Sequence, residues 1–196
     1  MKKGKYEAIV IGVSAGGMDA LRKIIPLLPS DFSASIIVVQ HLHPQSDDFL
    51  AIDLDKKSRL TVKQADEKEK LMPGLVYFAP PNYHLLIENN KTFSLSICDM
   101  INYARPSIDI LFETAAETFQ EKLIGIVLTG ANRDGCLGAK KIKECGGMVI
   151  VQDPNTAEVQ LMPRSVIESV KVDYVLPLDN IAHFLIEHVQ KEWKKA

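Results

Sequence analysis

The sequence predicts an α/β protein with a doubly wound, mostly parallel sheet flanked by helices, in a Rossmann-like arrangement of three layers. Short apolar runs rich in β-branched residues alternate with segments whose apolar residues recur at helical spacing. A glycine-rich turn follows the first apolar run, where a strand would pass into a helix. No repeat, low-complexity tract or linker interrupts the 196 residues, so we expect one domain over residues 1–196.

The first part of the chain predicts two strand–helix pairs. Residues 8–11 form a continuous apolar run, and the helix that follows the glycine-rich turn is expected to stop at Pro26. Residues 35–40 predict a second buried strand, and residues 47–57 a second helix.

The middle of the chain has turn signals at short spacing. Pro73-Gly74, Pro80-Pro81-Asn82 and Asn89-Asn90 separate four short apolar segments. The strands expected there are 60–65, 75–79, 84–87 and 92–97. This spacing is typical of hairpins, so we expect part of the sheet to be antiparallel, with an antiparallel hairpin at one edge.

Strand–helix alternation returns in the last part of the chain. Ser107, just after Pro106, is a plausible N-cap for a helix over residues 107–119. The remaining expected strands are 123–128, 148–151 and 174–176, and the remaining expected helices are 135–145, a short one from Pro163, and 180–193. Gly146-Gly147 gives a C-cap signal for the first of these helices.

Composition and charge exclude several classes of protein. A net charge of −2 gives no basic surplus for nucleic acid, and no run approaches the ~20 apolar residues of a membrane span. The N-terminus lacks the pattern of a signal peptide, so a cytoplasmic protein is expected. Three scattered cysteines fit a reducing compartment and form neither a disulfide framework nor a zinc site. Nothing in the sequence specifies an oligomeric state.

Three polar residues are expected at one rim of the sheet. Ligands bind beyond the carboxyl ends of strands in open parallel sheets. Ser14 follows the first strand, His41 the second, and Asp134 the strand over residues 123–128. An imidazole can take the proton of a serine hydroxyl and a carboxylate can fix its tautomer, so these residues are a candidate catalytic triad.

Simpler interpretations of each residue stay open at this point. Ser14 can be the N-cap of the first helix, or part of a phosphate-binding loop. His41 can be a polar residue satisfied at a strand end, and Asp134 a helix N-cap. Gly12 and Gly16 would allow a sharp strand-to-helix turn that presents the Ser14 hydroxyl.

Two other chemistries compete with the triad. A dinucleotide site is suggested by Gly12-x-Ser14-x-x-Gly17, but Ser14 replaces a glycine that the pyrophosphate needs, and no acidic residue ends the second strand. A metallohydrolase would use His41-x-His43 with acidic residues, namely Asp47, Asp48 or Asp134.

The metal interpretation lacks a third histidine nearby, because His84, His183 and His188 are expected to be surface residues of strands or helices. Cys136 lies at a predicted helix N-terminus, where a thiolate is favoured, but a small residue packing the helix start is the simpler interpretation.

Seven segments in order resemble the signatures of the CheB-type protein-glutamate methylesterase family over residues 6–188. They are Ile11-Gly-Val-Ser-Ala-Gly-Gly17, Val38-Val-Gln-His-Leu42, Pro73-Gly-Leu-Val-Tyr-Phe-Ala-Pro80, Arg105-Pro-Ser-Ile-Asp109, Leu128-Thr-Gly-Ala-Asn-Arg-Asp-Gly135, Gly146-Gly-Met-Val-Ile-Val-Gln-Asp153 and Met162-Pro-Arg164.

The resemblance implies a function and a role for each candidate. Ser14 matches the family's nucleophile, His41 its general base and Asp134 the carboxylate that orients the base. The family hydrolyses γ-glutamyl methyl esters on the cytoplasmic helices of chemoreceptors, and many members also deamidate receptor glutamines. No metal or cofactor is implied. We expect an oxyanion donor near Ala131, and Arg105 and Arg133 are charge-based candidates for substrate contact.

The chain also departs from the family pattern. Ala15 replaces a threonine, Ala131-Asn132 replaces Met-Gly, and Leu161 replaces a glycine. If position 132 needs a positive φ, asparagine is the best substitute for glycine. Typical members carry an N-terminal receiver domain, whereas Met1 here lies only a few residues before the first expected strand. We expect either a member that naturally lacks the receiver domain or the catalytic part of a longer protein. The departures at Ala15 and Ala131 keep one alternative function open: a catalytically impaired relative that acts as a receptor-binding or regulatory module.

Overall fold

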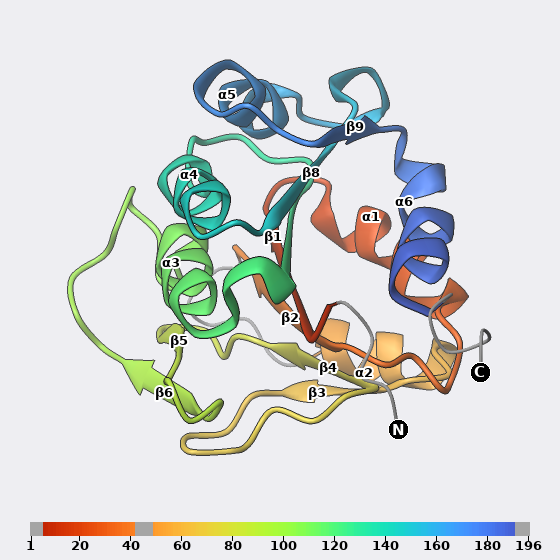
Figure 1. The fold of residues 1–196 in the computed structure, drawn as a ribbon, viewed down its shortest axis with the longest axis vertical. Helices are drawn as coiled ribbons and strands as arrows, with labels where there is room; N and C mark the ends of the chain where they lie inside the picture. The colour runs from red at the N-terminus through yellow and green to blue at the C-terminus, as the bar shows by residue number, and fades with distance from the viewer. Residues whose placement is uncertain (1–5, 42–48, 191–196) are drawn as a thin grey trace.

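The computed structural model describes residues 6–41 and 49–190 of the chain, and it contains a seven-stranded parallel sheet between two layers of helices (Figure 1). The strand order is β3-β4-β2-β1-β7-β8-β9. The strands are β1 (Ala8–Val13), β2 (Ser35–Gln40), β3 (Thr61–Gln64), β4 (Leu75–Phe78), β7 (Leu123–Val127), β8 (Met148–Gln152) and β9 (Tyr174–Leu176). The predicted fold class is confirmed.

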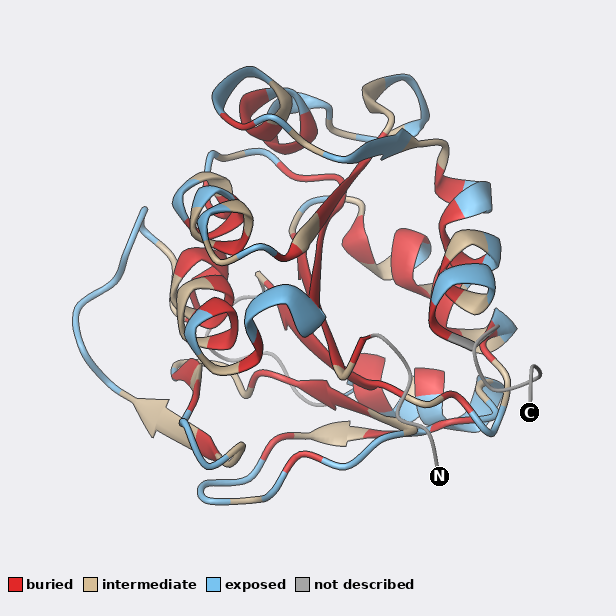
Figure 2. Ribbon diagram, in the orientation of Figure 1, coloured by how far each residue is buried: buried red, intermediate tan, exposed pale blue. Residues whose placement is uncertain are grey.

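The helices cover both faces of the sheet. One face carries α1 (Gly17–Ile24), α2 (Phe49–Lys57) and α6 (Leu178–Leu185), and the other carries α3 (Ile108–Phe119), α4 (Cys136–Glu144) and α5 (Leu161–Ser169). Short turns of 3₁₀-helix occur at Ile25–Leu27, Gln120–Lys122 and Pro154–Thr156, and a π-helical turn at Ile186–Gln190. Two apolar cores result, one on each face, and Figure 2 shows the central strands and the inward sides of the helices as buried, whereas the edge strand β9 is mostly exposed.

The pairing of the middle strands agrees with the prediction for one pair and differs from it for another. The antiparallel hairpin is present as β5 (His84–Ile87) and β6 (Phe93–Ser96), which form a two-stranded sheet of their own. β3 and β4, whose turn signals suggested a further hairpin, pair in parallel, with Val62 opposite Val76. The chain between them is too long for a tight turn: residues 65–74 return across the molecule and pair at Lys70 with Thr92.

The sheet places the carboxyl ends of β1, β2 and β7 side by side. β1 pairs with β2 on one side and with β7 on the other, so the order of the strands reverses at β1. Gly12 lets β1 approach α3 closely, since a Cβ there would lie 2.4 Å from Ile108 Cγ2. This reversal is where open α/β sheets bind ligands.

Within the part of the chain that the structure describes, no helix has both the length and the apolar character to cross a bilayer.

Candidate functional site

Backbone hydrogen bonds bring the three predicted residues to one rim. The Ser14 N–H donates to the Thr129 carbonyl over 3.0 Å, which joins the end of β1 to the segment after β7. The His41 N–H donates to the Val13 carbonyl over 3.0 Å, which joins the end of β2 to β1. The ladders of the parallel sheet thus continue past the strands and fix the loops that carry the candidate residues.

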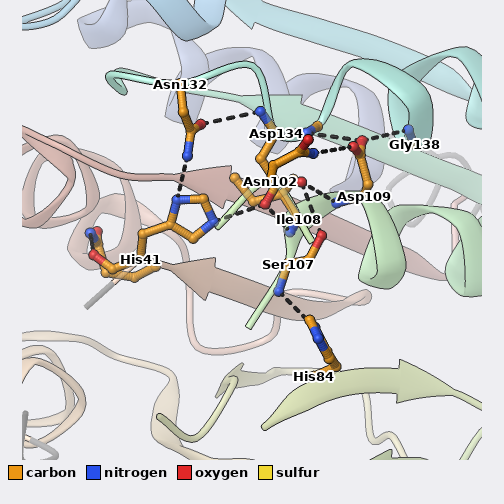
Figure 3. A network of polar contacts seen from close by, with 11 residues as sticks. His41, His84, Asn102, Ser107, Ile108, Asp109, Asn132, Asp134 and Gly138 are labelled. Carbon is orange, nitrogen blue, oxygen red and sulfur yellow. Dashed lines mark hydrogen bonds and ion pairs between the residues drawn. The ribbon is translucent and has the colours of Figure 1, made fainter. Parts of the chain in front are cut away.

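Asp134 is fully buried and its carboxylate accepts four hydrogen bonds (Figure 3). Three come from the start of α3: Ser107 Oγ at 3.0 Å, the Ile108 N–H at 2.7 Å and the Asp109 N–H at 3.0 Å. The fourth joins Asp134 Oδ2 to His41 Nε2 at 2.9 Å. Asp134 is therefore not the N-cap of the helix that follows it, because that residue is Gly135. Its carboxylate instead accepts the first N–H groups of α3 from a distant segment of the chain.

A second buried carboxylate mirrors this arrangement. Asp109, in the first turn of α3, accepts hydrogen bonds from the N–H groups of Gly135 and Gly138 at the start of α4, at 2.9 and 2.8 Å. Each of the two helices thus has its N-terminus satisfied by an aspartate attached to the other. This reciprocal capping fixes the position of Asp134.

The two carboxyl groups have opposite pKa shifts. Burial, together with the neighbouring charge of Asp134, raises the pKa of Asp109 to about 6. Burial also opposes ionisation of Asp134, but hydrogen bonds from His41 and from the Ile108 and Asp109 N–H groups outweigh it and lower the pKa of Asp134. At neutral pH Asp134 is therefore an ionised acceptor for the imidazole.

The His41 ring is held at both nitrogens. Nε2 faces the Asp134 carboxylate, so it carries the proton and donates it. Nδ1 then has a lone pair, and the Asn132 side-chain amide lies 3.2 Å from it. Only 12% of the His41 side chain is exposed. An imidazole with one tautomer fixed by a carboxylate is arranged as a general base, with Nδ1 as the basic atom.

Ser14 lies in a loop shaped by glycine. Gly16, with φ of 77°, is the N-cap of α1, so Ser14 is not the cap that the simpler interpretation proposed. The Ser14 carbonyl accepts from the Gly17 N–H over 2.9 Å. The Ser14 hydroxyl makes no hydrogen bond to any residue that the structure describes. Its backbone is fixed while its side-chain oxygen stays available for another partner.

Gln40 holds the Ser14 loop and His41 together, a role that the sequence did not indicate. Its side-chain Nε2 donates to the carbonyls of Ser14 and His41, at 2.9 and 3.0 Å. Gln40 Oε1 packs against Gly17, where a Cβ would lie 2.1 Å away. An amide at a strand end beside a candidate base is the signal that could have pointed to it.

His84 contradicts the prediction of a surface position, because it is completely buried. Its Nδ1 accepts from the Ser107 N–H over 3.1 Å, and its Nε2 lies 3.0 Å from the Asp99 carbonyl. Ser107 is the N-cap residue of α3, as predicted, but its hydroxyl is used for Asp134 rather than for its own helix. His84 therefore supports the start of α3 through Ser107. This is a tertiary contact, so no local pattern in the sequence indicates it.

The remaining predicted residues lie around this centre. Ala131 and Arg133 are exposed in the loop after β7. Arg105 uses Nη1 to donate to the carbonyls of Ile97 and Cys98, at 2.8 and 3.0 Å, which ties part of its guanidinium to the protein. Asn132 is not among the residues with positive φ, so its backbone does not explain the asparagine. Burial raises the pKa of Cys136, which opposes a reactive thiolate.

The structure gives no support to the metal interpretation. Within residues 6–41 and 49–190, no group of three or more His, Cys, Asp or Glu side chains is arranged to hold an ion. The residues His43, Asp47 and Asp48, which that interpretation used, lie outside the described residues.

A three-layer α/β fold, an imidazole–carboxylate pair and a serine in a glycine loop at the reversal of strand order define a candidate hydrolase of the serine class. The chain belongs to the CheB methylesterase family, whose sequence model matches residues 9–185.

Individual relatives agree with that assignment. A solved structure, the CheB methylesterase catalytic domain of Thermotoga maritima, superposes with a TM-score of 0.91 at 46% identity, covering 94% of this chain and 99% of that one. The Thermotoga maritima protein-glutamate methylesterase/protein-glutamine glutaminase is 47% identical over 184 residues, which are 92% of this chain and 54% of that protein. A Leptospira interrogans relative is 58% identical over 181 residues, which are 92% of this chain and 94% of the relative.

Proposed function

We propose that this protein is a serine hydrolase that demethylates γ-glutamyl methyl esters on chemoreceptor helices, and that it also deamidates glutamines there. The observation that carries the proposal is the 2.9 Å bond between His41 and Asp134 at strand ends adjoining the Ser14 loop, in a chain of the CheB methylesterase family. Relatives named protein-glutamate methylesterase/protein-glutamine glutaminase support both activities.

The geometry of His41 assigns the atoms in the proposed mechanism. Asp134 occupies Nε2, so Nδ1 takes the Ser14 proton as Oγ attacks the ester carbonyl. When the tetrahedral intermediate collapses, Nδ1–H gives its proton to the departing methanol. A water molecule then loses a proton to Nδ1 and attacks the acyl-enzyme, which releases the glutamate side chain and regenerates Ser14.

Backbone N–H groups stabilise the oxyanion in this proposal. The proposed donors are N–H groups at the start of α1, which begins three residues after Ser14, and the Ala131 N–H. Ala131 follows Gly130, where a Cβ would lie 3.0 Å from Ser14 Cβ. Loss of one such donor typically lowers kcat by about 10²–10³.

The proposed substrate is a protein helix rather than a small molecule. Arg133 is exposed beside Asn132, so its guanidinium is accessible to an acidic surface of a receptor. Arg105 is a weaker candidate, because its Nη1 is engaged by carbonyls of its own chain. The proposal places the protein in the cytoplasm, which the free thiols of Cys98, Cys136 and Cys145 support.

The alternative function, a receptor-binding or regulatory module without catalysis, is not favoured. Asp134 would be kept to cap α3 in either case, but a module without catalysis would have no need of His41 bonded to that carboxylate beside the Ser14 loop. The named activity of the relatives points the same way.

Methanol release from a methylated receptor fragment tests the proposal. Ser14→Ala should lower the rate by about 10⁴–10⁶, because the residual rate comes only from binding and oxyanion stabilisation. Ser94→Ala, a serine on the β5–β6 hairpin, is the matched control and should match the wild-type rate. Equal rates for Ser14→Ala and wild type would favour the binding module, and loss of activity on adding a chelator would favour a metallohydrolase.

A further inference from the structure

The Asn132 side chain occupies the nitrogen of His41 that the proposed mechanism needs. Its Nδ2 lies 3.2 Å from His41 Nδ1, while the other ring nitrogen is bonded to Asp134 (Figure 3). The Ser14 hydroxyl has no hydrogen-bond partner among the described residues. The base therefore points its lone pair at an amide of the neighbouring loop instead of at the nucleophile.

The orientation of that amide follows from its other contact. Asn132 Oδ1 accepts the Asp134 N–H over 3.2 Å, which leaves Nδ2 as the end that faces the ring. Because Asp134 keeps the proton on Nε2, Nδ1 can only accept. Both ends of the amide are thus matched, donor to acceptor, and the contact with His41 is a hydrogen bond from Asn132 to the imidazole.

We infer that Asn132 is a positioning residue that holds His41 in a resting state, and that Nδ1 must pass from the Asn132 amide to the Ser14 hydroxyl before attack. The inference rests on the proposed function and concerns regulation of the same site. An N–H donor on Nδ1 stabilises the neutral, correct tautomer of the ring but competes with Ser14 for the same lone pair. A substrate that draws the 131–133 loop toward itself would release the base.

Other charged groups near the ring do not reproduce this effect. Asp134 acts at Nε2, and Asp109 lies behind Asp134 against the start of α4. Arg133 is exposed in the loop, and Glu158 covers Gly16, where a Cβ would lie 2.8 Å from Glu158 Oε2. Of the described residues, only Asn132 bonds to Nδ1.

The first measurement is the ring pKa of His41, obtained from the NMR signals of the imidazole protons. Those signals are assigned by their absence in a His41→Gln variant. Asn132→Ala removes a donor that favours the neutral ring, so the ring pKa should rise. Asn132→Asp presents an acceptor instead and should raise it further. Asn155→Ala is the matched control, since that asparagine bonds Asp153 on the neighbouring rim loop and should leave the value unchanged.

The second measurement is the rate at which a fluorophosphonate labels Ser14 in the full chain at a pH above the ring pKa. Without the competing amide, Asn132→Ala should label about two- to tenfold faster than wild type, as expected for removal of one neutral hydrogen bond. Circular dichroism confirms that each variant is folded. An unchanged ring pKa, or labelling no faster than wild type in a folded Asn132→Ala variant, overturns the inference.

The two proposals fail in different ways. If Ser14→Ala still releases methanol, the assignment of the nucleophile fails, whereas the ring pKa still reports on the contact between Asn132 and His41. If Ser14→Ala is inactive and the ring pKa does not respond to Asn132→Ala, the hydrolase stands and the resting-state contact is rejected.

Discussion

The carboxylate side of the candidate site and its nucleophile side are held in different ways. Asp134 is buried, and its oxygens accept four hydrogen bonds that also complete the start of α3. Ser14 is partly exposed, and among the described residues its hydrogen bonds are made only by its backbone, with Thr129, Gly17 and Gln40. On the carboxylate side, the same Asp134 oxygens stabilise α3 and orient His41. On the nucleophile side, the Ser14 backbone makes the stabilising contacts and the hydroxyl is left for the chemistry. Substitutions on the two sides should therefore differ in whether lost activity comes with lost stability.

Asp134→Asn should have the largest combined effect. The amide would leave one buried donor facing N–H groups of α3 and would not fix the His41 tautomer, so kcat should fall by about 10³–10⁴. The free energy of unfolding should fall by about 1–3 kcal/mol, measured by urea denaturation. Ser14→Ala, in contrast, should abolish activity at nearly unchanged stability. Equal stability of the two variants would remove the contrast between the sides.

Gly130→Ala should disturb the nucleophile side by packing alone. A Cβ at Gly130 would lie 3.0 Å from Ser14 Cβ and 2.6 Å from Met162 Cε. Displacing Ser14 should lower kcat by about 10²-fold, with a loss of about 1–3 kcal/mol in unfolding free energy. Gly125→Ala is the matched control. Gly125 lies within β7, and its added Cβ would lie 2.4 Å from the side chain of Ile142 on α4, away from Ser14. The control should lose similar stability and keep its kcat; a comparable fall in its kcat would contradict the local explanation.

The smallest effect should be the pH dependence that Asp109 gives to stability. Its folded pKa is raised from 3.8 to about 6, so the native state binds the Asp109 proton more tightly than the unfolded state does. The stability that this proton contributes is fully present below pH 3.8 and is lost as the pH rises through 6. An asparagine at position 109 cannot ionise, so the Asp109→Asn variant should not lose stability in this way. Between pH 4 and 7 the unfolding free energy of the variant, relative to wild type, should rise by about 1–3 kcal/mol.

The measurement is a series of denaturation curves at intervals of half a pH unit. Asp134, whose pKa is lowered, changes its contribution only below pH 3.8, outside this window. A relative stability that is flat or falls with pH would show that Asp109 ionises normally in the native state.

The strands were predictable because their apolar runs carry the information locally. The runs at 35–40, 84–87 and 174–176 coincide with β2, β5 and β9, and the parallel order placed Ser14, His41 and Asp134 at one rim. The direction of β3 relative to β4 was not predictable from turn signals. It depends on β4 pairing with β2, a contact between segments about 40 residues apart.

The supports of the site were not predictable for a similar reason. His84 has the sequence context of an exposed strand residue, and its partners at Ser107 and Asp99 are brought to it only by tertiary structure. Asn132 was explained by backbone conformation, whereas its side chain bonds a residue 91 positions away. The sequence indicates which residues stand at strand ends, and the structure is needed to see what holds them there.

The exchange of capping carboxylates between α3 and α4 has a consequence for which residues would be retained in homologues that lost the catalytic activity. A lineage that abandoned hydrolysis could replace Ser14 freely, since none of the helices that the structure describes depends on that hydroxyl. It would keep Asp134 and Asp109, because losing either exposes a helix end in the interior. Among divergent homologues, retention of the aspartate therefore reports a fold under selection, and only retention of the serine reports an enzyme.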